Sequence, residues 1–345
     1  SDPDGDSLSA ALVSDVSDGD LTLRSGGSFD YDPGQGFTGT DRFEYEASAG
    51  GKADTATATI EVESRGEPFI TTWETTSPDS VVTIPTEEST SDYDFQVKWG
   101  DGTTETYSGP DPDPSHSYDQ AGTYTVEISG TFPRIFLNAP FEGDKADALR
   151  LQTIEQWGSI RWENMRRAFA GASDLTYAAT DKPDLSDVTD MSGMFSGATN
   201  FNGDLGGWDV SSVTAMVAMF QGATAFNQDI SGWDVSSVTS MSYMFDGATS
   251  FDQDLGSWDV TSVEDSNPDF EDSFEQFLDG VELSPENYDS LLRGWSQLDL
   301  TDGLTFDAGR SQYTSAAEEA RQSIIDQNGW TINDGGPPLR QRCTG

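Results

Sequence analysis

The sequence of 345 residues predicts a multidomain fold, in which two all-β sandwich domains precede a leucine-rich-repeat α/β solenoid with a helical C-terminal cap. Three observations predict this fold class. Short strands that alternate with Gly, Asp and Pro turns fill the first part of the chain, which is typical of sandwiches. Near-identical segments then recur every 25 residues, as in "FNGDLGGWDV", "FNQDISGWDV" and "FDQDLGSWDV", and this period is typical of a solenoid. Helical patterns with capping residues follow the repeats.

The chain is strongly acidic, with 62 Asp and Glu residues against 17 Lys and Arg and a formal net charge of -45. A polyanion would be repelled over the whole surface, so nucleic acid is excluded as a partner. Two interpretations of the acid remain open: binding of divalent cations, or a halophilic protein whose self-repulsion is screened by high salt. Scarce Lys and abundant Asp favour the second interpretation.

The sequence contains no apolar run long enough to span a membrane, so membrane insertion is not expected. Its one cysteine, Cys343, excludes an intramolecular disulfide. Whether Cys343 is free or bridges two chains is left open. The chain starts on "SDPDGDS" rather than on a signal peptide, so we expect a longer precursor or a trimmed fragment.

Residues 1–65 are predicted to form the first β-sandwich. The segments "DPDGDSL", "GSFDYDPGQGFTGTDRFEYEAS" and "DTATATIEV" resemble bacterial cadherin-like and Ig-like tandem repeats of surface adhesins. The resemblance implies calcium held by Asp2, Asp4, Asp6 and Asp41, because neighbouring carboxylates offer several oxygens to a hard cation. The alternative is a solvated, Asp-rich turn. Such repeats carry strands before the acidic turn, so we expect a missing N-terminal strand, through truncation or through donation by another domain or subunit.

Residues 66–140 are predicted to form the second sandwich. The motifs "WGDGT", "HSY" and "AGTYTV" resemble the core of PKD-type domains. Asp101 and Gly102 are expected in a hairpin turn. His116, the only histidine, occupies the position of a structural histidine in that resemblance. A lone histidine could also act as a base or ligand, but the sequence offers no second histidine or nearby nucleophile to support that role.

Residues 141–280 are predicted to form the solenoid. Within a repeat, "SVTSMSYMFDGA" has apolar residues at helical spacing, and "DISGWDV" is expected to be a strand. A column of Met and aromatic residues could line a ligand site, but core packing is the favoured interpretation. The aligned apolar positions include Met191, Met216 and Met241; Phe195, Phe220 and Phe245; and Trp208, Trp233 and Trp258.

Polar positions recur at the same period. Asp209, Asp234 and Asp259 are expected to cap the turn or helix that follows each of them. Two further columns are interpreted as turns or, alternatively, as a strip that binds a ligand or cations, together with Ser231. These columns are Asn202, Asn227 and Asp252, and Asp204, Asp229 and Asp254.

Residues 281–336 are predicted to form an α/β cap, with residues 337–345 as a flexible tail. Ser284 is expected as N-cap with Pro285 at the first helical position, and Ser315 with Glu318 as a capping box. The sequence of residues 95–336, including "WENMRRAFAGASDL" and "LSPENYDSLLRGWSQL", resembles the BspA-like leucine-rich-repeat surface-protein family. That resemblance implies an extracellular, cell-associated or secreted binding protein without known catalysis or cofactor.

No sequence motif of catalysis stands out: GxSxG, HExxH, the P-loop and a Cys/His pair are all missing. We therefore expect a non-enzymatic extracellular surface protein that binds a protein or glycan through the repeats, carried on calcium-stiffened β domains. The alternative is a structural assembly subunit of a filament, surface layer or virion decoration, bound to copies of itself by strand donation or domain contacts.

Overall fold

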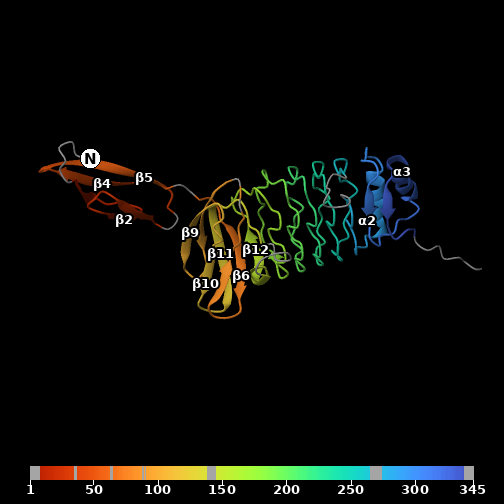
Figure 1. The fold of residues 1–345 in the computed structure, drawn as a ribbon, viewed down its shortest axis with the longest axis horizontal. Helices are drawn as coiled ribbons and strands as arrows, with labels where there is room; N and C mark the ends of the chain where they lie inside the picture. The colour runs from red at the N-terminus through yellow and green to blue at the C-terminus, as the bar shows by residue number, and fades with distance from the viewer. Residues whose placement is uncertain are drawn as a thin grey trace, which may run out of the picture. The chain divides into compact units, whose positions relative to one another are not determined.

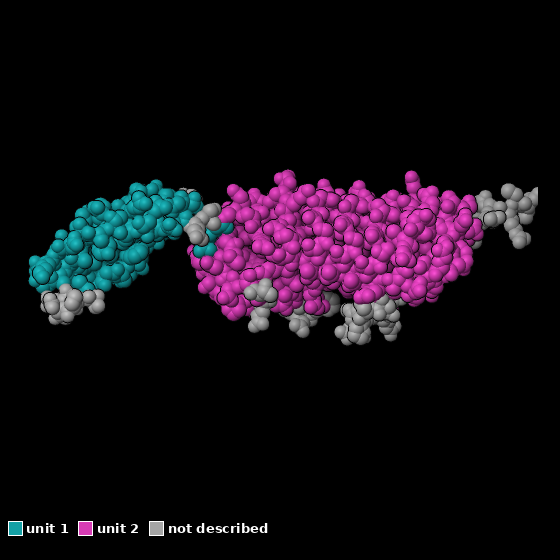
Figure 2. Space-filling view, turned by 90° about the horizontal axis from the view of Figure 1, so that it is seen from above, with its two compact units in different colours: residues 1–65 teal, residues 66–345 magenta. Residues whose placement is uncertain are grey.

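The computed structural model describes residues 8–34, 37–62, 65–87, 89, 91–137, 145–264 and 274–337. The chain divides into two compact units, residues 1–65 and residues 66–345 (Figure 2). Within the described residues, no helix is both long and apolar enough to cross a bilayer.

The first unit consists of two small antiparallel sheets. One has the strand order β1-β4-β5, and the other is the hairpin β2-β3. Gly50 and Gly51 both have positive φ and connect β4 to β5, as a two-residue hairpin turn requires. The strands are β1 (Ser9–Ser14), β2 (Gly19–Leu23), β3 (Phe29–Pro33), β4 (Gly39–Ala49) and β5 (Lys52–Val62).

The first unit has very little core. In β4 the residues alternate, with Asp41 and Phe43 buried on one face and Arg42 and Glu44 exposed on the other. Phe43 is the one buried hydrophobic residue among residues 8–34 and 37–62. Few of the described residues therefore cover the inner face of this unit.

The second unit begins with a six-stranded sheet in the order β13-β12-β6-β11-β8-β9 and a two-stranded sheet, β10-β7 (Figure 1). Buried and more exposed residues alternate along β6 and β8, so one face of the large sheet is buried. The elements are β6 (Phe69–Thr75), β7 (Ser80–Thr83), β8 (Tyr93–Lys98), β9 (Thr104–Gly109), β10 (Ser115–Tyr118), β11 (Gly122–Thr131), α1 (Lys145–Arg150), β12 (Leu151–Gln156) and β13 (Thr176–Tyr177).

The large sheet continues into the repeats. β12 pairs antiparallel with β6 on one side and parallel with β13 on the other. Residues 66–140 and the repeats therefore share one sheet and one compact unit. The finer boundaries at residues 140, 280 and 336 stay predictions.

The predicted leucine-rich-repeat α/β solenoid is wrong. Between β13 and residue 285, the described residues contain no helix and no strand, only turns and isolated parallel bridges such as Asp190 to Ala215 and Ala215 to Ser240. The protein is mostly β-sheet with few helices. The physical reason lies in the backbone: Tyr243 and Gly247 have left-handed φ angles of 59° and 70°, which interrupt any helix.

The backbone hydrogen bonds of the repeats alternate between two kinds of partner. The Met244 N–H donates to the Met241 carbonyl within its own turn, whereas the Phe245 N–H donates to the Phe277 carbonyl in the next turn of chain. An α-helix would instead satisfy every N–H four residues back. Successive repeats are thus stacked turns joined by hydrogen bonds.

The side chains between these turns form the core, which confirms the interpretation of the Met, Phe and Trp columns. The rings of Phe195 and Phe220 lie 5.8 Å apart between centroids, and those of Phe220 and Phe245 lie 5.6 Å apart. Trp233 and Trp258 are also stacked, at 6.5 Å. Each buried aromatic side chain of this kind contributes roughly 1.5–3 kcal/mol.

The left-handed backbone of each turn fixes one glycine position in each repeat. A Cβ on Gly247 would lie 3.6 Å from the Cα of Gly222, and both glycines have φ near +70°. Glycine adopts this conformation without steric cost. The sequence motif "GA" that ends each "MF" turn therefore has a backbone cause.

The chain ends in a mixed segment rather than in the predicted helical cap: two helices alternate with two short parallel strands. Pro285 starts its helix as expected, but the Ser284 side chain makes no capping bond. The predicted capping box is also wrong, because the next helix starts at Glu318 with Ala317 before it. The elements are α2 (Pro285–Trp295), β14 (Thr305–Asp307), α3 (Glu318–Asn328) and β15 (Thr331–Asn333).

Candidate ligand surface on the repeats

The predicted amide column lies on consecutive repeats and is exposed at Asn202 and Asn227. Oδ1 of Asn202 accepts the N–H of Asn227 at 2.9 Å, and Oδ1 of Asn227 accepts the N–H of Asp252 at 2.9 Å. The Asp252 carboxylate then accepts the Ser284 N–H and the Asn287 side-chain amide. The column is thus a ladder of side-chain to backbone bonds that connects the repeats to α2.

The predicted carboxylate column forms local turns. Oδ1 of Asp204 accepts the Gly206 N–H at 3.1 Å, and Oδ1 of Asp254 accepts the Gly256 N–H at 2.8 Å. Between them, Oδ1 of Asp229 accepts both the N–H and the hydroxyl of Ser231. The Ser231 hydroxyl and N–H lower the pKa of Asp229, so this exposed carboxyl stays ionised.

Asp209, Asp234 and Asp259 form the same type of turn at a later position in each repeat. Each accepts an N–H and a hydroxyl from the residue two positions later, for example Ser236 on Asp234 at 3.1 and 2.6 Å. They cap turns rather than helices. The repeats therefore present two periodic rows of exposed carboxylates. Asp204, Asp229 and Asp254 form the row that belongs to the predicted strip together with the amide column. Asp209, Asp234 and Asp259 form a separate row.

Large apolar side chains do not contribute to this surface. The exposed large hydrophobic residues of the described chain all precede residue 150. Recognition through the repeats would consequently rely on amide, hydroxyl and carboxylate groups rather than on an aromatic patch.

The predicted calcium residues are only partly described. Asp2, Asp4 and Asp6 lie outside the described residues. Asp41 is 2% exposed, and its carboxylate accepts the N–H groups of Ser17, Asp18 and Arg42 and the hydroxyl of Tyr31. These donors occupy both oxygens, so Asp41 does not fit a calcium ligand. In the described part of the chain, no group of three or more acidic, His or Cys side chains is placed to hold a metal.

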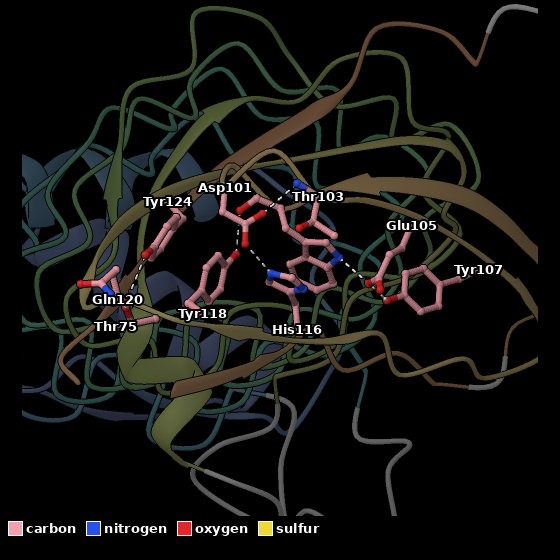
Figure 3. Close-up of polar contacts among 10 residues, drawn as sticks. Thr75, Asp101, Thr103, Glu105, Tyr107, His116, Tyr118, Gln120 and Tyr124 are labelled. Carbon is pink, nitrogen blue, oxygen red and sulfur yellow. Dashed lines mark hydrogen bonds and ion pairs between the residues drawn. The ribbon is translucent and has the colours of Figure 1, made fainter. Parts of the chain in front are cut away.

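His116 lies in an aromatic cluster of the second unit (Figure 3). Its Nε2 is 2.7 Å from Oδ2 of Asp101, and its ring stacks on Trp99 at 5.1 Å and meets Tyr118 edge-on at 4.7 Å. Burial would raise the pKa of Asp101, but the bonds from His116 and Thr103 lower it overall. These contacts connect the hairpin turn at Asp101 to β10, so the role they give His116 is structural.

Two segments of the chain match known families. Residues 1–64 match the family described as a bacterial cadherin-like domain, and residues 146–280 match the family described as a Mycoplasma protein of unknown function, DUF285. The cadherin-like match supports a surface protein of the adhesin type. The PKD-type and leucine-rich-repeat resemblances are not confirmed by these matches. No curated protein and no solved structure matches the chain significantly.

The cadherin-like match is compatible with an extracellular or cell-surface location. The DUF285 match covers the strip, since all of its predicted residues lie between positions 146 and 280. A family described as of unknown function gives no ligand for this surface.

Sequence reasoning missed several side chains that complete this surface. Nε2 of Gln253 donates to Oδ1 of Asn227 at 2.6 Å. The hydroxyl of Thr214 donates to the Thr189 carbonyl, and that of Thr239 to the Thr214 carbonyl. The recurrence of "VT" at the repeat period could have indicated the threonine ladder, whereas the Gln253 contact depends on the stacking geometry.

Proposed function

We propose that this protein is a non-enzymatic extracellular surface protein that adheres to a protein or glycan through the polar strip on its repeats. The observation that carries the proposal is the exposure of amide and carboxylate side chains at equivalent positions of consecutive repeats. The bacterial cadherin-like match supports the surface location.

The strip suits a partner whose own polar groups repeat. Equivalent residues of neighbouring repeats are linked by backbone and side-chain bonds of about 3 Å, so their rows are spaced like paired strands, at about 4.8 Å. Hydrogen bonds within the turns fix the side chains of Asp204, Asp229 and Asp254 in the unbound protein. Such preorganisation reduces the entropy that binding would otherwise cost.

A charge-neutral replacement tests the strip without breaking its turns. In the triple variant Asp204→Asn, Asp229→Asn, Asp254→Asn, the side-chain oxygen that accepts the turn N–H is retained and the charge is lost. The matched control is Asp209→Asn, Asp234→Asn, Asp259→Asn, which changes the other carboxylate row in the same way.

Binding is measured for the full chain on cell surfaces and on an immobilised glycan panel at fixed ionic strength. We expect the strip variant to lose at least tenfold in affinity and the control to keep it. Equal loss in both variants would show that net charge, rather than the strip, is responsible. Unchanged binding in both would refute the strip as the site.

Calcium stiffening of the β domains remains part of the proposal through Asp2, Asp4 and Asp6 alone. These three residues precede β1 in the sequence, and their carboxylates would supply oxygen ligands to the cation. Asp41 is assigned a structural role instead, because its oxygens are already occupied.

The second candidate function, a structural assembly subunit, is favoured by one observation. A groove of about 310 Å³ remains open on the first unit, lined by Leu8, Leu23, Phe29, Phe43, Tyr45 and Ala58. Phe29 is 44% exposed and Leu8 is 50% exposed. Apolar surface of this kind marks contacts with other polypeptides.

A further inference from the structure

β5 is an unprotected edge strand. All eleven of its residues pair with β4 in a regular register, and no other described strand pairs with its second edge. Natural edge strands are usually short, bulged, or interrupted by Pro or Lys. β5 has no bulge and no Pro, and its one Lys stands at the first position.

The centre of β5 has the same sequence in both directions. Residues 55–59 read Thr-Ala-Thr-Ala-Thr. In an antiparallel pair of two β5 strands centred on Thr57, Thr55 of one copy lies opposite Thr59 of the other, and Ala56 lies opposite Ala58. The two Thr57 side chains meet on the two-fold axis. Cross-strand Thr pairs of this kind stabilise sheets.

The centred register also avoids like charges, which matters in a chain of net charge -45. It places Asp54 opposite Ile60, Glu61 opposite Ala53 and Lys52 opposite Val62. No carboxylate lies directly opposite a carboxylate, although pairing uses the full length of the strand. Like charges directly opposite one another would destabilise the pair.

The faces of the strand match as well. Ala56, Ala58 and Ile60 pair with β4 residues of the inner face, such as Tyr45 and Phe43, whereas Thr55, Thr57 and Thr59 are on the outer face. The centred register joins inner face to inner face. It extends the apolar side of the sheet, which few described residues of the first unit cover.

We propose that a second copy of this chain pairs with the free edge of β5, forming a two-fold symmetric antiparallel contact centred on Thr57. The contact is isologous and closes after two copies. It joins two three-stranded sheets into one continuous sheet of six strands. The proposal goes beyond adhesion, because it requires no ligand on the repeats.

The dimer forms more readily at high salt. A single strand pair contributes modestly to association, and two chains of charge -45 repel each other at low ionic strength. Dimerisation that strengthens with salt distinguishes this contact from a salt bridge, which salt would weaken.

Cysteine cross-linking tests the contact. In the full chain with Cys343→Ser, the variant Thr57→Cys places the new thiols on the two-fold axis, where the Cα separation of about 4.5–5.5 Å between opposed residues suits a disulfide. The matched control is Thr22→Cys, on the exposed face of another strand of the same unit. We expect Thr57→Cys to form the covalent dimer at least tenfold faster in high salt. Equal rates would overturn the proposal.

Opposite charges at the same position test the register. Thr57→Glu and Thr57→Lys each place two like charges on the axis, so each variant alone is expected to sediment as a monomer. Their mixture is expected to dimerise again, which also shows that both variants are folded. A wild-type chain that stays monomeric at all salt concentrations overturns the proposal. So does a Thr57→Glu variant that dimerises alone, or a mixture that stays monomeric.

Discussion

Asp41 connects three elements of the first unit through one side chain. It lies in β4, and its carboxylate accepts the N–H groups of Ser17 and Asp18, which lie between β1 and β2, and the hydroxyl of Tyr31 from β3. Burial alone would raise the pKa of Asp41, but these bonds and the Arg42 N–H hold it far below its ordinary value. A buried carboxylate with this many donors is strongly stabilised in its charged form.

This arrangement predicts an acid-sensitive first unit. A depressed folded-state pKa adds stability above the unfolded pKa of about 3.9, and that stability is lost as the pH falls below it. In calorimetry of the full chain, we expect Asp41→Asn to lower the transition of the first unit at pH 7, because the amide NH2 faces N–H donors. The difference from wild type should shrink below pH 4.

The control for this prediction is Asp20→Asn, an exposed position of β2. It should leave the same transition unchanged. A difference between wild type and Asp41→Asn that stays constant from pH 7 to pH 2 would show that the charge of Asp41 does not contribute.

At the scale of elements, the sequence predicted the strands and misassigned the repeats. The alternation of side-chain types and the flanking turn residues predict β4, β5 and β11, because one face of each strand is more exposed to solvent than the other. In the repeats, Val238, Met241 and Phe245 have helical spacing, yet the backbone makes turns in which an N–H donates to the carbonyl three residues back. Such turns also bring every third or fourth side chain to one side. The spacing therefore could not distinguish a helix from stacked turns.

The positions of the strip residues could be predicted, but their roles could not. The period of 25 residues places Asn202 and Asn227 on consecutive repeats in any stacked arrangement. That Asn227 accepts the Asp252 N–H depends on the offset between neighbouring turns, which the sequence does not specify. The calcium role of Asp41 was implied by the family resemblance, which does not specify the backbone donors that contact its carboxylate.

The amide ladder predicts a stacking defect at Asn227. Its Oδ1 accepts the Asp252 N–H and the Gln253 side chain, so Asn227→Ala leaves both donors without this acceptor. We expect the free energy of unfolding of the second unit to fall by about 1 kcal/mol. This is measured from the transition of that unit when the full chain is denatured with urea. Asn227→Asp keeps the acceptor and serves as the control. Its own defect, from added negative charge, should disappear at high salt, whereas the defect of Asn227→Ala should persist.

At the scale of the molecule, the two units differ in how they are stabilised. The second unit has a continuous core from Phe69 to Ile332, whereas the described first unit buries only Phe43 among its hydrophobic residues. Stability increases with the apolar area that is buried, so the first unit depends more on hydrogen bonds, on pairing partners and on solution conditions. The proposed β5 contact would extend its sheet.

The net charge of -45 predicts that salt stabilises both units. Asp209 and Asp234 lie in one row, and the charge of Asp209 acts to raise the pKa of Asp234, although the local Ser donors lower the pKa of both overall. These two carboxylates therefore stay charged and repel each other in the folded state. The Debye length falls from about 10 Å at 0.1 M salt to about 3 Å at 1 M. Most of the gain in melting temperature should thus occur below 1 M.

Sodium chloride and choline chloride at equal ionic strength should raise the melting temperature by similar amounts if screening is the cause. Calcium binding by Asp2, Asp4 and Asp6 is separated from screening by adding EDTA at fixed ionic strength, which should lower only the transition of the first unit. A melting temperature independent of salt would mean that the acid is already neutralised within the fold. Asp229, Asp234 and Asp259 each accept a hydrogen bond from a neutral turn donor, which leaves their charge uncompensated and argues against that outcome.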